Sequence, residues 1–202
     1  MYLTQCKKPR GVSHQGLREL WYCRIAEQRH GEKREDIKLM SRTPEYLQTA
    51  ADRSMIQDLL ARYAWEIDHG TPEGWAALFT EDGIFEAPAL GLWVQGGAAL
   101  VAFARDVHRT LPNVHHMMSN FVIEVSGERG RGRCELNEFM ARPEAIYPNL
   151  QGWYEDDYVF DAKRWRITHR RVFIAEPASL MAGKVGEYFS SFFQACEKYQ
   201  RT

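Results

Sequence analysis

Two neighbouring histidines, His115 and His116, begin the segment HHMMSNFVIEVSG, which has the composition of a β-strand. Adjacent side chains on a strand point to opposite faces, so only one of the two rings can enter a given cavity. Histidine changes charge close to neutral pH, which makes the inward ring a candidate general acid or base. The alternative interpretation is a hydrogen-bonded residue of the cavity wall.

The alternation of apolar residues along this strand favours His115 as the inward residue. Its face also carries Met117, Ser119, Phe121, Ile123 and Val125, whereas the face of His116 carries Met118, Asn120, Val122 and Glu124. The first set is the more apolar one. A bulge between His116 and Phe121 would reset the register and turn His116 inward instead.

A carboxylate, Asp68, lies at the end of the strongest predicted helix, which runs from Asp52 to Ile67 before Gly70. The helix dipole disfavours a negative charge at this end, so Asp68 needs a compensating donor or a functional reason to be there. An ordinary aspartate that opens the DHGTP turn is the alternative. Tyr63 precedes Asp68 by five residues, about 140° around an ideal helix, so both can line one cavity only if it is broad or the last turn loosens.

The elements around these residues predict an α+β fold. Thr71 and Pro72 begin a second helix, IFEA and LWVQ are short strands, and a third helix follows from Gly97 to about His108. Four long strand-like runs come next, separated by turn signals at residues 128–130, 143–149 and 161–163. We expect a curved, mostly antiparallel sheet wrapped over the N-terminal helices.

Composition excludes several classes of protein. The 202 residues are 45% hydrophobic, and a net charge of -1 gives no reason to expect a nucleic-acid partner. No apolar run is long enough to span a membrane and no secretory signal is evident, so we expect a cytoplasmic protein. The cysteines are scattered without a C-x-x-C pair, which indicates neither a disulfide framework nor a thiolate zinc site: Cys6, Cys23, Cys134 and Cys196.

Three regions are expected along the chain. Residues 1–40 are polar and mixed in charge, and Met40 would serve equally well as a start, so this stretch reads as an N-terminal extension. Residues 41–176 form the α+β domain. Residues 177–202 form a C-terminal aromatic helix, which either caps a cavity or lies at a subunit interface.

The chain resembles the SnoaL-like branch of the nuclear transport factor 2-like superfamily over roughly residues 45–175. The resemblance lies in MIQDLLARYAWEIDHGTPEGWAALFTEDGIFE, in HHMMSN and in GWYEDDYVFDAKRWRITHRR. It is nearest to the subgroup of scytalone dehydratase, bile acid 7α-dehydratase and hexachlorocyclohexane dehydrochlorinase. It implies a cone-shaped α+β barrel.

The resemblance also implies which residues act. Those enzymes use an Asp at the end of the first long helix and a His in the pattern H-x-x-x-N, which selects Asp68 and His116, against the alternation. Tyr63 matches a dehydratase tyrosine, and Arg170 lies five residues after a Trp, as in the dehydrochlorinase. A solvated arginine, or a partner for an Asp on the neighbouring strand, is the alternative for Arg170.

The implied chemistry is cofactor-independent removal of a carbon-bound proton, as in a dehydratase, dehydrohalogenase or isomerase. Asp68 would orient His116 as the base, while Tyr63 and Arg170 would stabilise developing negative charge. No metal or organic cofactor is needed. The substrate would be a small hydrophobic cyclic molecule bound in a mostly apolar pocket. The candidate binding residues are Trp75, Phe79, Phe85, Trp93, Phe103, Met118, Cys134, Leu136, Glu138 and Val172. The alternative interpretation of Glu138 is a residue at the outer edge of the sheet that pairs with an arginine.

Two other functions remain open on the sequence. The small subunit of a ring-hydroxylating dioxygenase has this fold without chemistry of its own, and so does a ligand-binding SnoaL-like protein. The lyase would act alone as a homo-oligomer, a trimer by analogy, whereas the dioxygenase subunit would co-purify with a large iron-containing partner.

Overall fold

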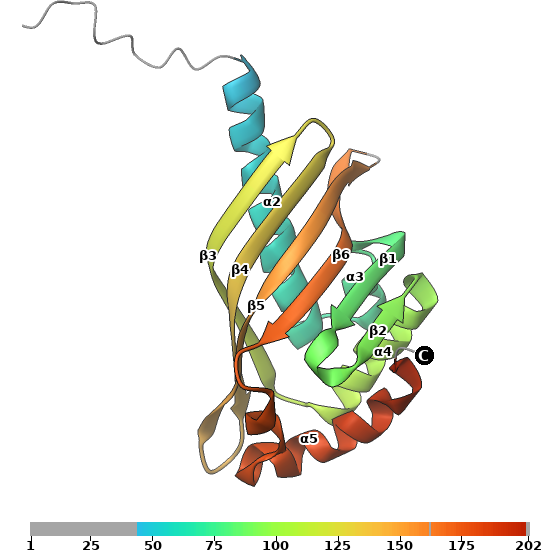
Figure 1. The fold of residues 1–202 in the computed structure, drawn as a ribbon, viewed down its shortest axis with the longest axis vertical. Helices are drawn as coiled ribbons and strands as arrows, with labels where there is room; N and C mark the ends of the chain where they lie inside the picture. Colours follow the sequence, from blue (N-terminus) through green and yellow to red (C-terminus); the bar gives the residue numbers. More distant parts are fainter. Residues whose placement is uncertain (1–43, 162, 201–202) are drawn as a thin grey trace, which may run out of the picture. The chain divides into compact units, whose positions relative to one another are not determined.

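The computed structural model describes residues 44–161 and 163–200 (Figure 1). The extension expected over residues 1–40 lies outside the described residues. The α-helices are α2 (Pro44–His69), α3 (Pro72–Ala76), α4 (Gly97–Thr110) and α5 (Gly183–Cys196). The strands are β1 (Phe79–Ala87), β2 (Leu92–Gln95), β3 (Val114–Ser126), β4 (Arg129–Ala141), β5 (Ile146–Asp161) and β6 (Arg164–Ile174). Short 3-10 helices are η1 (Pro88–Leu90), η2 (Pro177–Met181) and η3 (Glu197–Tyr199).

The strands form one sheet in the order β2-β1-β6-β5-β4-β3. Every neighbouring pair is antiparallel except β1 and β6, which are parallel. The sheet curves over α2 without closing, and α5 lies along the end of the sheet near β2 and α4 (Figure 1). This confirms the expected curved α+β architecture. Within the described residues, no helix is both long and apolar enough to cross a membrane.

The helices begin where their sequences permit it. The Thr71 side chain accepts a hydrogen bond from the Gly74 N–H at 2.9 Å, and Pro72 occupies the first position of α3, as expected. Helix α2 begins at Pro44, eight residues before the expected start at Asp52. Its first turns are largely exposed, so they carry no apolar stripe that periodicity could detect.

Two strands are longer than expected because each contains an irregularity. Strand β1 begins at Phe79, five residues before the expected IFEA strand, and its pairing with β6 shifts between Phe79 and Ile84. Strand β5 begins at Ile146, inside the turn expected over residues 143–149. Its pairing with β4 shifts so that Asn149 is an extra residue between Pro148 and Leu150. A bulge tolerates proline and asparagine, which ordinarily signal a loop.

A bulge in β3 decides which histidine faces the core. Ser119 pairs with Glu135 and Val122 with Arg133, so two residues of β3 oppose the single Cys134 of β4. Asn120 has a φ of 53°, in the left-handed region that asparagine tolerates better than most residues. The inward phase therefore changes at this point of the strand. Before it His116 and Met118 turn inward, and after it Phe121, Ile123 and Val125 do.

The bulge makes a prediction about stability. Replacing Asn120 with valine forces a β-branched residue into the left-handed region and should cost about 1–2 kcal/mol of unfolding free energy, measured in urea. Glycine at the same position should cost much less. Valine at the exposed neighbour Ser119 is the control, with a change within about 0.5 kcal/mol. Equal losses at the two positions would contradict the role given to the bulge.

Candidate active site

A buried hydrogen-bonded pair joins the end of α2 to the start of β3. Asp68 Oδ1 lies 2.6 Å from His116 Nδ1, and Asp68 Oδ2 accepts the backbone N–H of His116 at 2.8 Å. The side chains are only 7% and 11% exposed. His116 therefore supplies the donors that a carboxylate at a helix C-terminus requires. The partner fixes both the orientation of the ring and the position of a proton on Nδ1.

The other ring nitrogen of His116 faces a second carboxylate. Glu138 Oε2 on β4 lies 3.1 Å from His116 Nε2, and Glu138 Oε1 accepts a hydrogen bond from the side-chain amide of Asn149. His116 and Glu138 are cross-strand neighbours, and Asn149 is the bulged residue of β5. Glu138 is buried and pairs with a histidine, in place of the arginine partner at an outer edge that was the alternative.

The two carboxylates keep the imidazole charged. Burial lowers the pKa of His116, but the negative charge of Glu138, the hydrogen bonds to both carboxylates and the charge of Asp68 outweigh this effect. Together they raise the pKa from the ordinary value of 6.5 to about 10. At neutral pH His116 is therefore an imidazolium that holds a proton on each nitrogen.

Beside this pair lies a mostly apolar cavity of about 70 Å³. Its polar side chains come from Tyr63, Trp75, His116, Glu138 and Tyr154. Leu180 of η2 and two phenylalanines of α5 close one side. The complete wall is Tyr63, Ile67, Trp75, Phe85, Ala87, Leu90, Leu92, Phe103, Val107, Leu111, His116, Leu136, Glu138, Leu150, Tyr154, Val172, Ile174, Leu180, Phe189 and Phe192.

Most residues expected at the site line this cavity: Tyr63, Trp75, Phe85, Phe103, His116, Leu136, Glu138 and Val172. Six others do not line it: Asp68, Phe79, Trp93, Met118, Cys134 and Arg170. Phe79 packs behind Trp75, with ring centroids 4.9 Å apart. Trp93 contacts His169 and donates to Gln95 instead. Cys134 is buried opposite the bulge of β3, and Met118 packs partly buried against the core. Asp68 reaches the cavity only through His116.

Arg170 belongs to a separate buried ion pair. Its Nε and Nη2 donate to the two carboxylate oxygens of Asp156 at 2.8 and 2.7 Å, and both side chains are 0% exposed. The guanidinium lies between the rings of Tyr63 and Tyr154, 3.9 and 4.0 Å from their centroids. This geometry matches the alternative of a partner for an Asp on the neighbouring strand. Burial raises the pKa of Tyr63, so its hydroxyl stays protonated.

Sequence reasoning missed three residues around the site. Asp156 and Tyr154 lie on β5, where they pair directly with Arg170 and Val172 of β6. The two-residue spacing in each strand is a signal that could have placed them on one face. Asn149 carries no such signal, because its position depends on the bulge in β5.

Comparison with known proteins relates the chain to one family of domains. The family model for the SnoaL-like domain matches residues 48–171. An uncharacterised protein of Mycobacterium tuberculosis strain H37Rv, Rv2910c, is 29% identical over 124 residues, which are 59% of this chain and 83% of that protein. A solved structure of a single-residue variant of Rv3472, a protein of unknown function from the same species, has a TM-score of 0.72 and 27% identity. It covers 80% of this chain and 98% of its own.

Solved structures from Novosphingobium aromaticivorans share the fold. A protein described as NTF2-like with a cystatin-like fold has a TM-score of 0.60 and 20% identity, covering 78% of this chain and 99% of its own. A "Putative Scytalone Dehydratase" has a TM-score of 0.56 and 22% identity, covering 63% of this chain and 86% of its own. The beta subunit of a "putative aromatic-ring-hydroxylating dioxygenase" has a TM-score of 0.55 and 18% identity, covering 63% of this chain and 90% of its own. These likenesses confirm the expected nuclear transport factor 2-like fold.

The raised pKa of His116 predicts how stability depends on pH. The folded protein holds the proton up to about pH 10, whereas an unfolded histidine loses it near pH 6.5. The stabilisation is therefore complete below about pH 6.5 and is lost as pH rises through 10, by at most about 1.4 kcal/mol per pH unit. Urea unfolding from pH 6 to 10.5 should show this decline in the wild type and a shallower one in His116→Gln. Parallel curves would contradict it.

The buried pair of Arg170 and Asp156 predicts a second stability effect. Asp156→Ala leaves the guanidinium buried without a counter-charge and should cost about 3–5 kcal/mol of unfolding free energy. Asp157→Ala is the matched control, because its side chain is 32% exposed and its partners are surface arginines. That change should cost no more than about 1 kcal/mol. Chemical denaturation measures both, and similar losses would refute the distinction.

Proposed function

The chain belongs to the SnoaL-like domain family, and on this premise we propose that it is a cofactor-independent lyase or isomerase of the dehydratase type. It would remove a carbon-bound proton from a small hydrophobic cyclic molecule. The observation that carries the proposal is the imidazole of His116, held between two carboxylates in the wall of an apolar cavity. This arrangement offers a proton donor and a proton acceptor at one place.

The energetic cost of this arrangement supports a catalytic role over a structural one. Three ionisable side chains, Asp68, His116 and Glu138, are largely withdrawn from water. Apolar residues of similar volume often stabilise a core as well as, or better than, buried ions do. A subunit that only holds its partners together, or a module that only binds an apolar ligand, gains nothing from this cluster. Local departures from core packing rules of this kind are expected at functional sites.

The geometry supports a specific division of roles. The resemblance implies that Nε2 of His116 is the base, but this nitrogen already faces Glu138. We therefore assign proton removal from carbon to the Glu138 carboxylate. The electron pair of that C–H bond forms the double bond as the C–O bond breaks. His116 delivers its Nε2 proton to the departing oxygen, and water leaves.

The same contact returns the site to its starting state. After elimination Glu138 holds the proton taken from carbon and His116 is neutral. Transfer of that proton across the 3.1 Å contact to Nε2 restores the imidazolium and the carboxylate. Asp68 holds Nδ1 throughout and keeps the ring oriented.

The remaining polar groups support binding of a substrate oxygen. Trp75 lines the cavity, and its buried indole N–H has no acceptor among the described residues. An unpaired buried donor is costly, so a carbonyl or hydroxyl oxygen of the substrate would fill this role favourably. Tyr63 presents a protonated hydroxyl from the same wall.

The size of the cavity means that the wall must move when substrate binds. A volume of about 70 Å³ is far below the ~300–1,000 Å³ of typical ligand pockets. Leu180, Phe189 and Phe192 contribute the side formed by η2 and α5, the C-terminal segment of the described chain. We therefore propose that this segment withdraws when a cyclic substrate enters.

Substitutions in the buried cluster test the proposal. Asp68→Asn, His116→Gln and Glu138→Gln should each lower turnover by about 10²–10⁴-fold, the usual share of positioned proton transfer. Glu135→Gln is the matched control, because it changes an exposed glutamate of the same strand. The assay is a panel of neutral cyclic β-hydroxy ketones in D₂O, with mass spectrometry to follow loss of water and exchange of carbon-bound hydrogen.

The outcome also separates the lyase from the alternative function. Activity of the isolated protein, as the homo-oligomer proposed for it, supports the lyase. A dioxygenase subunit would show no exchange above the His116→Gln background on any compound and would co-purify with a large iron-containing partner. That combination would overturn the proposal.

A further inference from the structure

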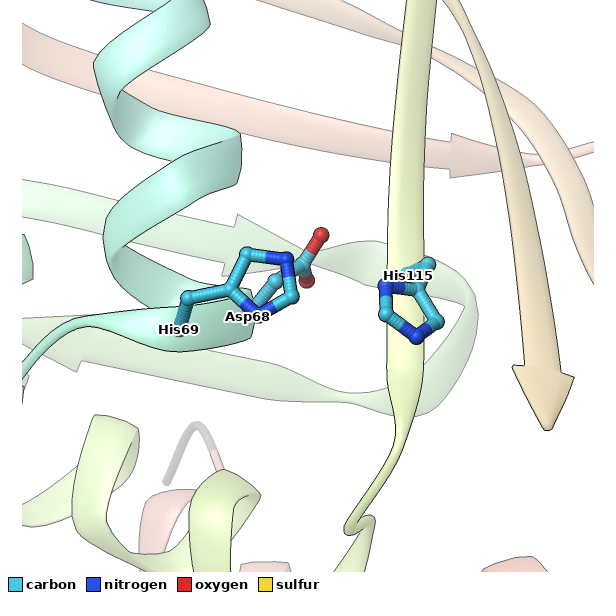
Figure 2. Close-up of side chains that lie close together, drawn as sticks. All are labelled: Asp68, His69 and His115. Carbon is cyan, nitrogen blue, oxygen red and sulfur yellow. The ribbon is translucent and has the colours of Figure 1, made fainter. Parts of the chain in front are cut away.

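A second group of polar side chains, which shares Asp68 with the first, lies where the end of α2 meets the beginning of β3. Asp68 and His69 form the end of α2, and His115 is the second residue of β3. One ligand atom from each lies within 4.8 Å of the other two. Figure 2 shows the carboxylate of Asp68 between the rings of His69 and His115. The rings are tilted by 50°, with centroids 5.3 Å apart.

We propose that Asp68, His69 and His115 form a binding site for a divalent ion of the Zn²⁺ class. Two imidazole nitrogens and one carboxylate oxygen are typical zinc ligands, and three protein ligands leave a fourth position open. Imidazole ligands favour Zn²⁺, Co²⁺ and Ni²⁺ over Mg²⁺ and Ca²⁺, which prefer oxygen. This inference goes beyond the proposed function and concerns binding alone.

Small movements of the side chains would bring the three ligand atoms to the separations of a zinc site. Ligand atoms of a tetrahedral zinc site with bonds of about 2.0–2.1 Å are about 3.4 Å apart, so atoms that lie within 4.8 Å of one another must approach by up to about 1.4 Å. Rotation of the two imidazole rings can supply this movement, because His69 is exposed at the last residue of its helix. Asp68 need not move, since each carboxylate oxygen has a lone pair beyond the one that accepts from His116.

The ion would connect the site to the catalytic cavity through one side chain. Hydrogen bonds from a second residue commonly orient a metal-binding carboxylate, and His116 already supplies two to Asp68. The ion would also join the end of α2 to the beginning of β3, which already meet in the contacts of Asp68 with His116 and of His69 with His115. The same carboxylate would thus serve both the ion and His116.

Binding of Zn²⁺ to the full chain tests the site directly. Isothermal titration should give one strong site per chain, and the double variant His69→Ala/His115→Ala should weaken it by about 100-fold or more. Asp68 stays intact in this variant, so the partner of His116 is preserved. His169→Ala is the matched control, because it removes a described histidine on β6 and should leave the affinity unchanged. Circular dichroism checks that each variant is folded.

Trp65 provides a local readout that does not depend on activity. Trp65 is 67% exposed, and the centroid of its ring lies 4.8 Å from the centroid of the His69 ring. Co²⁺ bound at this site should quench its fluorescence, and Trp65→Phe should abolish most of the quenching while leaving Zn²⁺ titration intact. Equal Zn²⁺ affinity in the wild type and the double variant, or quenching that persists in Trp65→Phe, would overturn the proposal. Failure of the lyase assay would leave this result unaffected.

Discussion

The contact between Asp68 and His116 is the interaction on which the site depends. A carboxylate at the C-terminal end of α2 opposes the helix dipole and is tolerated because one residue of β3 gives it two hydrogen bonds. One of these comes from the backbone, so the position of the strand is fixed together with the ring. The fold and the chemistry therefore share a single constraint: the end of the first long helix must meet the beginning of β3.

Two β-bulges in the sheet make this contact possible. In a regular strand His115 and Ile123 would share one face, whereas in β3 His115 is exposed and Ile123 is buried. Asn120 adopts a left-handed backbone conformation and shifts the alternation of side chains along β3, so that His116 and Ile123 both turn inward. The bulge at Asn149 brings an amide to Glu138, which in turn faces His116. Asparagine is well suited to both positions, because it tolerates irregular backbone and carries polar atoms that pair with side chains.

The sequence predicts the regular elements around this site but not the β-bulges at Asn120 and Asn149. The helices, the order of the long strands and the α+β class could be predicted, since each depends on a local period. The inward histidine could not be predicted from alternation, because the change of phase at Asn120 has no periodic signal; resemblance to a family selected His116 instead. The start of β5 was misplaced for the same reason, since Pro148 and Asn149 indicate a turn unless a bulge accommodates them.

The burial of Glu138 could not be predicted from its charge and its neighbours in the sequence. On sequence alone a glutamate in a strand next to arginines indicates a solvated edge, yet Glu138 is 7% exposed and pairs with an imidazolium. The imidazolium of His116 and the carboxylate of Glu138 neutralise each other in the cavity wall, and Arg170 and Asp156 neutralise each other outside it. A substrate that carried its own charge would therefore enter a mostly apolar cavity without a free counter-charge. The mechanism that we propose and the apolar lining of the cavity therefore favour the same molecules, which are neutral and carry an oxygen that can accept a proton from His116.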